Sequence, residues 1–194
     1  MTVPGRDDEL HEALGESQRL GFLGARPIPE VVEHARMYVR ALDDVDGTVA
    51  DIGAGGGVPG LVIAHDRPDL HLQLIDRRQK RTDFLERMRR RYAWLASVRV
   101  VCADVVDLAA AADDESDESA WSAPVDAVVA RGFGPPSSTL TLGASLVRPG
   151  GLIVISEPPD GDRWDARLVD EAGVRRLPVD RPGDRIVRFV RQVW

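Results

Sequence analysis

A glycine-rich segment at residues 49–60, VADIGAGGGVPG, constrains the fold of this chain more than any other feature. Apolar residues lead to an acid, Asp51, and glycines then occupy positions 53, 55, 56 and 57. Such glycines let the backbone turn tightly and leave room for a ligand against bare peptide. Pro59 suits the first turn of a helix, whose free N–H groups favour an anionic ligand. The segment predicts a strand, a ligand-binding loop and a helix; an ordinary tight connection is the alternative.

A second acid, Asp76, ends the apolar-rich stretch 71–75 and lies 25 residues after Asp51. An acid at the tip of the second strand is where the hydroxyls of a ribose would donate hydrogen bonds. A plain surface acid is the alternative, but the combination with the glycine loop favours a nucleoside cofactor.

The identity of that cofactor depends on Asp51. Gly55, Gly57 and Gly60 satisfy G-x-G-x-x-G, the pattern of dinucleotide sites. However, a carboxylate directly below the glycine turn would repel a pyrophosphate, whereas it could pair with the ammonium or sulfonium of S-adenosylmethionine. We therefore predict S-adenosylmethionine, with an NAD-dependent enzyme as a more distant alternative.

Strand and helix patterns alternate after the loop, which predicts an α/β fold with a mostly parallel sheet and helices on both faces. The expected strands are 71–75, 98–102, 127–130 and 152–156, with a turn at 149–151 and a closing antiparallel pair at 174–178 and 185–193. The expected helices are 59–65, 77–95, 135–147 and 165–171. Helical patterns at 7–15 and 28–42 make residues 1–45 a small N-terminal helical cap on one compact domain, residues 46–194.

Two further strand tips carry candidate site residues. Ligands of such sheets lie outside the carboxyl ends of the strands, so Asp104 and Val105 are placed to contact the adenine edge and ring. Arg131 follows the fourth strand among glycines, beside the expected cofactor. We therefore treat Arg131 as a functional candidate rather than a structural one.

The formal charge of −7 argues against indiscriminate nucleic-acid binding, so an RNA contact requires a local basic patch. Basic residues concentrate at 77–91, where an RNA-phosphate footprint and a solvated helix face are equally good interpretations. For His34, Arg36 and Arg40 we expect a solvated helix face rather than a substrate contact. The acidic stretch 109–122, including 112–119, is expected to be a disordered or surface insertion.

Several classes of protein are not expected. A single cysteine, Cys102, excludes an internal disulfide, and the four histidines lack the spacing of metal ligands. There is no charged-then-apolar leader and no run of 18 apolar residues. We expect a cytoplasmic monomer without a metal or a membrane anchor.

The motifs DIGAGGGVPG, RPDL, LIDRRQKRTDFL, VVARGFG and RPGG together resemble the bacterial small-subunit ribosomal RNA guanine-N7 methyltransferases, the GidB-like family. The resemblance covers about residues 49–156 and implies the Rossmann-like class I methyltransferase fold, with a seven-stranded sheet and S-adenosylmethionine as cofactor. It further implies 16S ribosomal RNA, free or in the small ribosomal subunit, as the partner. The chain departs from the family pattern at Ala130, Gly132 and Glu157.

The resemblance also implies roles for individual residues. Gly53 and Val58, in the same loop as Gly55, would line the methionine end of the cofactor; Asp76 would hold the ribose, and Val105 and Val106 the adenine. Arg131 would stand between cofactor and target, and Lys80 and Arg81 would contact the RNA backbone.

Guanine N7 is itself a nucleophile, so its methylation needs no general base. Catalysis would consist of positioning N7 roughly 3 to 3.5 Å from the methyl carbon. Arg131 would orient the base or a phosphate. A methyltransferase for a small molecule and a non-catalytic S-adenosylmethionine-binding protein stay open as alternatives.

Overall fold

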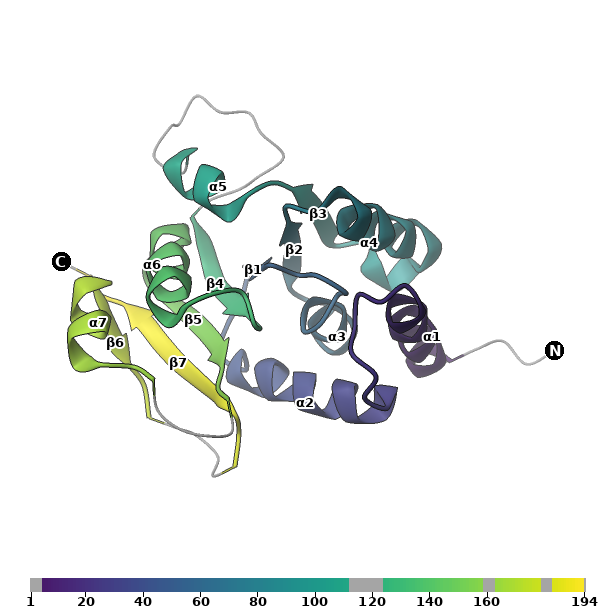
Figure 1. The fold of residues 1–194 in the computed structure, drawn as a ribbon, viewed down its shortest axis with the longest axis horizontal. Coiled ribbons are helices and arrows are strands. Elements are labelled where there is room, and N and C mark those ends of the chain that lie inside the picture. The colour runs from purple at the N-terminus through teal and green to yellow at the C-terminus, as the bar shows by residue number, and fades with distance from the viewer. Residues whose placement is uncertain (1–4, 112–123, 159–162, 179–182, 194) are drawn as a thin grey trace.

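The computed structural model describes residues 5–111, 124–158, 163–178 and 183–193. Its strands are β1 (Thr48–Ile52), β2 (His71–Asp76), β3 (Val98–Cys102), β4 (Val125–Ala130), β5 (Val147–Ser156), β6 (Val174–Arg176) and β7 (Ile186–Arg191). They form one sheet in the order β3-β2-β1-β4-β5-β7-β6, as Figure 1 shows. Strands β1 to β5 are parallel, and β7 is antiparallel to both of its neighbours. The predicted seven-stranded, mostly parallel sheet is confirmed.

The helices are α1 (Arg6–Arg19), α2 (Ile28–Ala41), α3 (Gly60–Asp66), α4 (Gln79–Arg91), α5 (Val105–Ala111), α6 (Pro136–Leu146) and α7 (Ala166–Glu171). A short 3-10 helix, η1 (Ala93–Leu95), follows α4. Within the described part of the chain, no helix combines the length and the apolar character that crossing a bilayer would require.

Three predicted boundaries were wrong. The long helix expected at 77–95 ends at Arg91, because Tyr92 is extended with its ring buried. Helix α5 was not predicted, and its last turn lay in the expected insertion. It forms because Val105 and Leu108, three residues apart, both face the core. The turn expected at 149–151 lies within β5, beside a shift in the β4–β5 register. The acidic stretch 112–119 lies outside the described residues.

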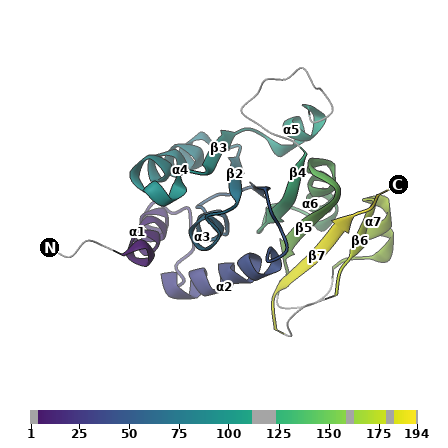
Figure 2. The same ribbon diagram turned by 180° about the vertical axis from the view of Figure 1, so that it is seen from behind.

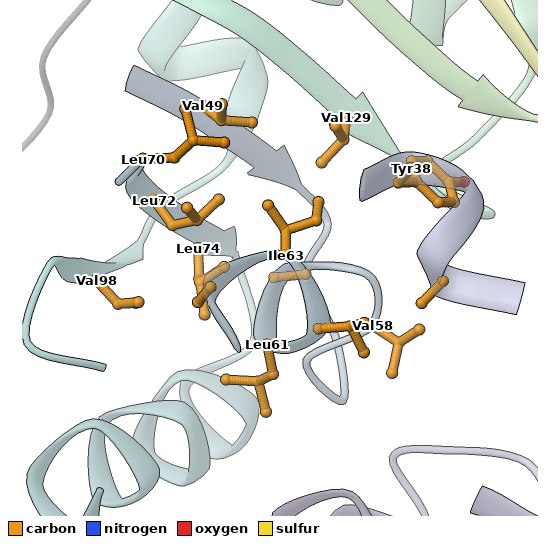
Figure 3. Packing of buried hydrophobic residues seen from close by; sticks show 14 of the residues in the cluster. Tyr38, Val49, Val58, Leu61, Ile63, Leu70, Leu72, Leu74, Val98 and Val129 are labelled. Carbon is orange, nitrogen blue, oxygen red and sulfur yellow. The ribbon is translucent and has the colours of Figure 1, made fainter. Parts of the chain in front are cut away.

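Alternate residues of each strand face two separate cores. Val49 points to the side covered by α1 to α4, and Ala50 points to the side covered by α5 and α6. Figure 3 shows Ile63 of α3 pointing toward Val49 and Leu72 of β2, while Leu61 lies on the other side of the helix in the same buried cluster. Burying one such aliphatic side chain contributes about 1.5 to 3 kcal/mol. Figure 2, seen from behind, shows that β7 and β6 extend the sheet next to α7.

The N-terminal helices share the core of the sheet. Leu10 and Leu14 of α1 and Tyr38 of α2 belong to the same buried cluster as Val49. The Tyr38 hydroxyl donates a 2.9 Å hydrogen bond to the carbonyl of Ala130 at the tip of β4 (Figure 3). Helix α2 thereby fixes the backbone directly before position 131. The domain boundary at residue 45 stays a prediction.

Hydrogen bonds from three elements hold the glycine loop between β1 and α3. The buried Ser17 hydroxyl of α1 donates to the carbonyl of Gly56 at 2.8 Å. The Gly55 N–H donates to Asp76 Oδ2 of β2 at 3.0 Å, and the Gly60 N–H donates to Asp51 Oδ2 of β1 at 2.8 Å. The first N–H of α3 is therefore engaged by Asp51, although we had expected it to be free for a ligand.

Glycine is required in this loop for two physical reasons. Gly57 has φ of 91°, and a Cβ atom there would lie 2.5 Å from Cδ1 of Leu61. A side chain at this position would be strained in its backbone and would also collide with α3. Gly57 therefore reflects a loop pressed against the helix that follows it, whereas Gly53 and Gly56 are close to Phe133 and Ser17.

Asp51 is the most unusual buried group of the loop. Its side chain is 1% exposed, and Oδ1 has no hydrogen-bond partner among the described residues. Burial raises the pKa of Asp51 to about 7, although the Gly60 N–H and the charge of Arg131 act to lower it. Folding therefore favours the protonated form of this carboxyl group.

Replacing Ser17 with Ala should lower the free energy of unfolding by about 1 to 3 kcal/mol, because the buried Gly56 carbonyl loses its donor. Urea denaturation measures this loss. Ser145→Ala is the matched control, since the exposed Ser145 hydroxyl bonds only to the carbonyl of Leu142 in its own helix. Its effect should stay within about 0.5 kcal/mol. Equal effects of the two substitutions would contradict the anchoring role of Ser17.

Replacing Asp51 with Asn should change how stability depends on pH. Between pH 5 and pH 7 the unfolded carboxyl has lost its proton and the folded one keeps it, so wild-type stability falls as pH rises. The free energy of unfolding of Asp51→Asn minus that of wild type should therefore rise by on the order of 1 kcal/mol per pH unit in this window.

Urea denaturation of both proteins between pH 5 and pH 8 checks this prediction, and the rise should level off above pH 7. Asp126→Asn is the control. Although burial acts to raise the pKa of Asp126, hydrogen bonds from Arg148 and the Thr48 N–H bring it below its ordinary value. The Asp126 carboxyl is ionised in both the folded and the unfolded state throughout this range. The free energy of unfolding of Asp126→Asn minus that of wild type should therefore not vary with pH. If the free-energy difference between Asp51→Asn and wild type is also independent of pH, the conclusion that folding favours the protonated form of Asp51 is wrong.

Candidate functional site

The loops after β1, β2, β3 and β4 surround a cavity of about 470 Å³ at the carboxyl edge of the sheet, which we call the first cavity. The predicted site residues that line it are Gly53, Asp76, Arg81, Asp104, Val105 and Val106. Residues from four different strand tips meet here because parallel strands end at the same edge.

The polar end of the first cavity is built around Asp76. Its Oδ1 accepts a 2.8 Å hydrogen bond from the N–H of Arg78, and its Oδ2 accepts from the N–H of Gly55. Nη1 of Arg81 lies 3.2 Å from the same Oδ2. The sequence had suggested Arg81 as an RNA contact, whereas the structure places its guanidinium inside the first cavity, against Asp76.

The apolar part of the lining includes residues that sequence reasoning did not select. Phe133 and Leu142 line the cavity with Val105 and Val106. Phe133 lies so close to Gly53 that a Cβ atom on this glycine would be 2.8 Å from the ring. The aromatic residue in VVARGFG was the available signal for Phe133. No local pattern pointed to Leu142, because it lies within α6, and only the packing of that helix brings it to the cavity.

Three predicted cofactor residues lie behind the cavity rather than on its wall. Asp51 and Val58 are buried at 1% and 6% exposure, and Gly55 contributes its N–H to Asp76. They hold the shape of the glycine loop. The uncompensated Oδ1 atom of Asp51 adds a site where a nearby cation would be stabilised.

These features fit a nucleoside cofactor. The first cavity has the size of a small-molecule site, and both acids and apolar side chains line it. The acid can accept hydrogen bonds from ribose hydroxyls, and the apolar end can pack against an adenine ring. Among the described residues, no group of three or more potential metal ligands was found.

A second cavity of about 400 Å³ adjoins the first, and Gly132 lines both. Its charged and polar lining residues are Arg26, His34, Arg131, Ser156, Glu157 and Arg185. Burial and then the charges of Arg131, Arg26 and Arg185 lower the pKa of His34. Arg131, predicted beside the cofactor, therefore faces the second cavity. His34 lines it as well, although a solvated helix face had been expected.

Most of the other basic residues of α2 and α4 form ion pairs outside the two cavities. Arg36 and Arg40 pair with Asp66 and Asp184, each at 3.0 Å. On α4, the ion pairs join Arg87 to Glu16 at 2.8 Å, Arg91 to Glu12 at 2.6 Å, and Arg89 and Arg90 to Glu86 at 2.6 and 3.0 Å. Lys80 is exposed and lines neither cavity. Of the two interpretations of this helix, the ion pairs favour a solvated structural face over an RNA footprint.

Comparison with known proteins identifies the family. The profile of the family GidB, described as rRNA small subunit methyltransferase G, matches residues 17–157. A protein named ribosomal RNA small subunit methyltransferase G from Beutenbergia cavernae is 32% identical over 175 residues, which cover 87% of this chain and 73% of that protein. The protein of the same name from Mycolicibacterium gilvum is 28% identical over 179 residues, which cover 89% and 74%.

Solved structures support the fold. Cofactor-bound Rv0187 from MTB superimposes with a TM-score of 0.63 at 15% identity, covering 98% of this chain and 93% of that chain. The apo form of the S-adenosylmethionine-dependent methyltransferase SibL gives a TM-score of 0.61 at 16% identity, covering 95% and 70%. The resemblance inferred from the motifs is confirmed: the chain has the class I methyltransferase fold and belongs to the GidB family, rRNA small subunit methyltransferase G.

Proposed function

We propose that this protein methylates guanine N7 in 16S ribosomal RNA, with S-adenosylmethionine as the methyl donor and the cytoplasmic small ribosomal subunit or its RNA as the partner. The observation that carries the proposal is the pair of cavities that adjoin at Gly132. One fits a nucleoside cofactor, and the other is cationic and open to an acceptor. Membership of the GidB family supports this combination.

The residues of the first cavity would hold the cofactor. Asp76 accepts hydrogen bonds from the ribose, Val105 and Val106 pack on the adenine, and Gly53 leaves room for the methionine end. Asp104 lies at the adenine edge. When bound, S-adenosylmethionine supplies an electrophilic methyl group on a sulfonium.

The reaction requires positioning rather than proton transfer. Guanine N7 attacks with its own lone pair, so no side chain has to remove a proton. Arg131 stands where the two cavities meet, and it orients the acceptor by donating hydrogen bonds to the base or to a phosphate. Tyr38 supports Arg131 indirectly, because its hydroxyl fixes the carbonyl of Ala130.

A small-molecule acceptor is the second candidate. The net charge of −7 and the ion pairs along α4 favour it, since both reduce the attraction of the surface for a polyanion. A protein that binds the cofactor without turnover is the third possibility. Transfer of label from S-adenosylmethionine separates the three.

Asp76→Asn should weaken S-adenosylmethionine binding by about 10-fold or more, because a charged acceptor of the ribose hydroxyls is lost. Isothermal titration measures the affinity, and Asp126→Asn is the control, because Asp126 lies at the amino end of β4 and does not line the first cavity. Loss of the ribose contact has a specific signature: 2′,3′-dideoxyadenosine should bind wild type and Asp76→Asn equally. A similar loss of affinity for this analogue would assign Asp76 a merely structural role.

Arg131→Ala should reduce methyl transfer about 100-fold while leaving cofactor affinity within a few-fold of wild type, because Arg131 lines the acceptor side. The assay uses labelled S-adenosylmethionine and small ribosomal subunits from a strain that lacks this protein. Digestion of the RNA then identifies the labelled nucleoside. The control is Arg167→Ala, which removes an equal charge from the exposed pair with Glu171 on α7.

Label recovered as N7-methylguanine, and lost with Arg131→Ala only, is the expected result. Label at another position of the RNA would overturn the assignment to guanine N7. Cofactor binding without labelled RNA would overturn the ribosomal substrate and would direct attention to small anionic acceptors.

A further inference from the structure

The second cavity contains more positive charge than the positioning of a base requires. We propose that Arg26 and Arg185 join Arg131 in a phosphate-binding site, and that this site holds the backbone phosphate of the RNA nucleotide that is methylated. The inference rests on the proposed function, and it adds two residues that neither the motifs nor the charge distribution had selected.

The three arginines come from distant parts of the chain. Arg26 lies between α1 and α2, Arg131 follows β4, and Arg185 immediately precedes β7. All three line the second cavity. Their charges also act together on one imidazole, since each of them lowers the pKa of His34, after burial as the largest cause. The fold therefore gathers three guanidinium groups around one hollow.

Hydrogen bonds hold the backbone of each arginine or of its neighbour. Nε2 of Gln18 donates to the carbonyl of Arg26 at 2.8 Å, and the N–H of Glu157 donates to the carbonyl of Arg185 at 2.8 Å. Ala130, the residue before Arg131, accepts the hydrogen bond from Tyr38. The backbone at each of the three arginines is thus held by the protein before a ligand arrives, while the guanidinium groups stay able to adjust to it.

The three guanidinium groups lack partners of their own. Among the residues that the structure describes, none of Arg26, Arg131 and Arg185 has a side-chain hydrogen bond or an ion pair. The carboxylate in the cavity wall, Glu157, is turned to other groups: Oε1 accepts from Nε1 of Trp164 and lies 3.8 Å from Nε of Arg163. Among the described residues, three arginines and one carboxylate line the cavity, which therefore keeps a net positive charge.

This charge contrasts with the protein as a whole, in which acids exceed bases by seven, and with α4, where Arg87 and Arg91 are paired with acids of α1. Unpaired guanidinium groups in one hollow repel each other, and an anion relieves that repulsion. A phosphate suits them because guanidinium groups bind its oxygens bidentately. Since Gly132 joins the two cavities, a nucleotide bound here can present its base toward the first cavity.

The first test measures RNA binding and turnover. Arg26→Ala and Arg185→Ala should each raise the KM for small ribosomal subunits about 10-fold and leave the affinity for S-adenosylmethionine unchanged. Each should also reduce the slope of log affinity against log salt concentration by about 0.7 to 1, as expected for the loss of one phosphate contact. Arg167→Ala should change neither value. Unchanged KM and salt slope in both variants would overturn the proposal.

The second test separates the phosphate site from the ribosomal substrate. Guanosine 5′-monophosphate and guanosine are titrated into the wild type with S-adenosylhomocysteine present. The phosphate should strengthen binding, and Arg26→Ala and Arg185→Ala should remove most of this difference, with the Lys variants retaining part of it. Equal binding of both compounds, or a preference that survives both Ala variants, would overturn the site even if ribosomal RNA is methylated.

If the phosphate preference is present and arginine-dependent but no ribosomal RNA is labelled, the proposed function fails while the anion site remains. That result would overturn the assignment of the phosphate to RNA and would identify the acceptor as a small anionic molecule. The two experiments therefore distinguish a failure of the phosphate site from a failure of the proposed ribosomal RNA methylation.

Discussion

The binding edge of this protein depends on the glycine loop between β1 and α3 being held in one conformation. Residues 53–57 of the loop include four glycines, so few side chains are available to pack, and hydrogen bonds to the backbone help to set its shape. Ser17, Asp51 and Asp76 supply these bonds from three different elements. Asp51 performs this task while buried, with one oxygen unpartnered. Such an arrangement destabilises the charged form of the carboxyl, and a nearby cation would relieve this penalty.

The N-terminal helices α1 and α2 are part of the core and of the site, rather than a separate cap on the sheet. They belong to the core beneath the sheet and supply two of the buried polar contacts, from Ser17 and Tyr38. Arg26 and His34 of the second cavity also come from this part of the chain. Both cavities therefore require residues 5–45 to be folded against β1 and β4.

The distribution of charge distinguishes two kinds of arginine. Those of α4 neutralise acids of α1 and of their own helix, so their contribution is largely structural. Surface pairs of this kind are worth little each, about 0 to 1 kcal/mol, but they leave the helix face with little net charge. Arg26, Arg131 and Arg185 make no ion pair with any described residue, and they give an acidic protein a local region that can attract a phosphate.

The sequence by itself determined the fold class and the part of the site that lies near the strand tips. The glycine segment, Asp76 and the alternation of strands and helices depend on local backbone rules, and these rules act over a few residues. For the same reason Val105 and Arg131 could be placed at the carboxyl edge of the sheet, where the first lines the first cavity and the second lines the second cavity; their roles there stay predictions. The local pattern also identified the family, whose profile covers residues 17–157.

Only the tertiary structure decided which basic residues face a cavity. Arg81 and Arg87 occupy the same helix, and no sequence pattern distinguishes them. However, Arg81 pairs with Asp76 in the first cavity, whereas Arg87 pairs with Glu16 of α1. Arg26 and Arg185 lie 159 residues apart and meet only because β7 and the α1–α2 connection reach the same edge of the sheet. The partners of a charged side chain are set by long-range packing, which no local pattern encodes.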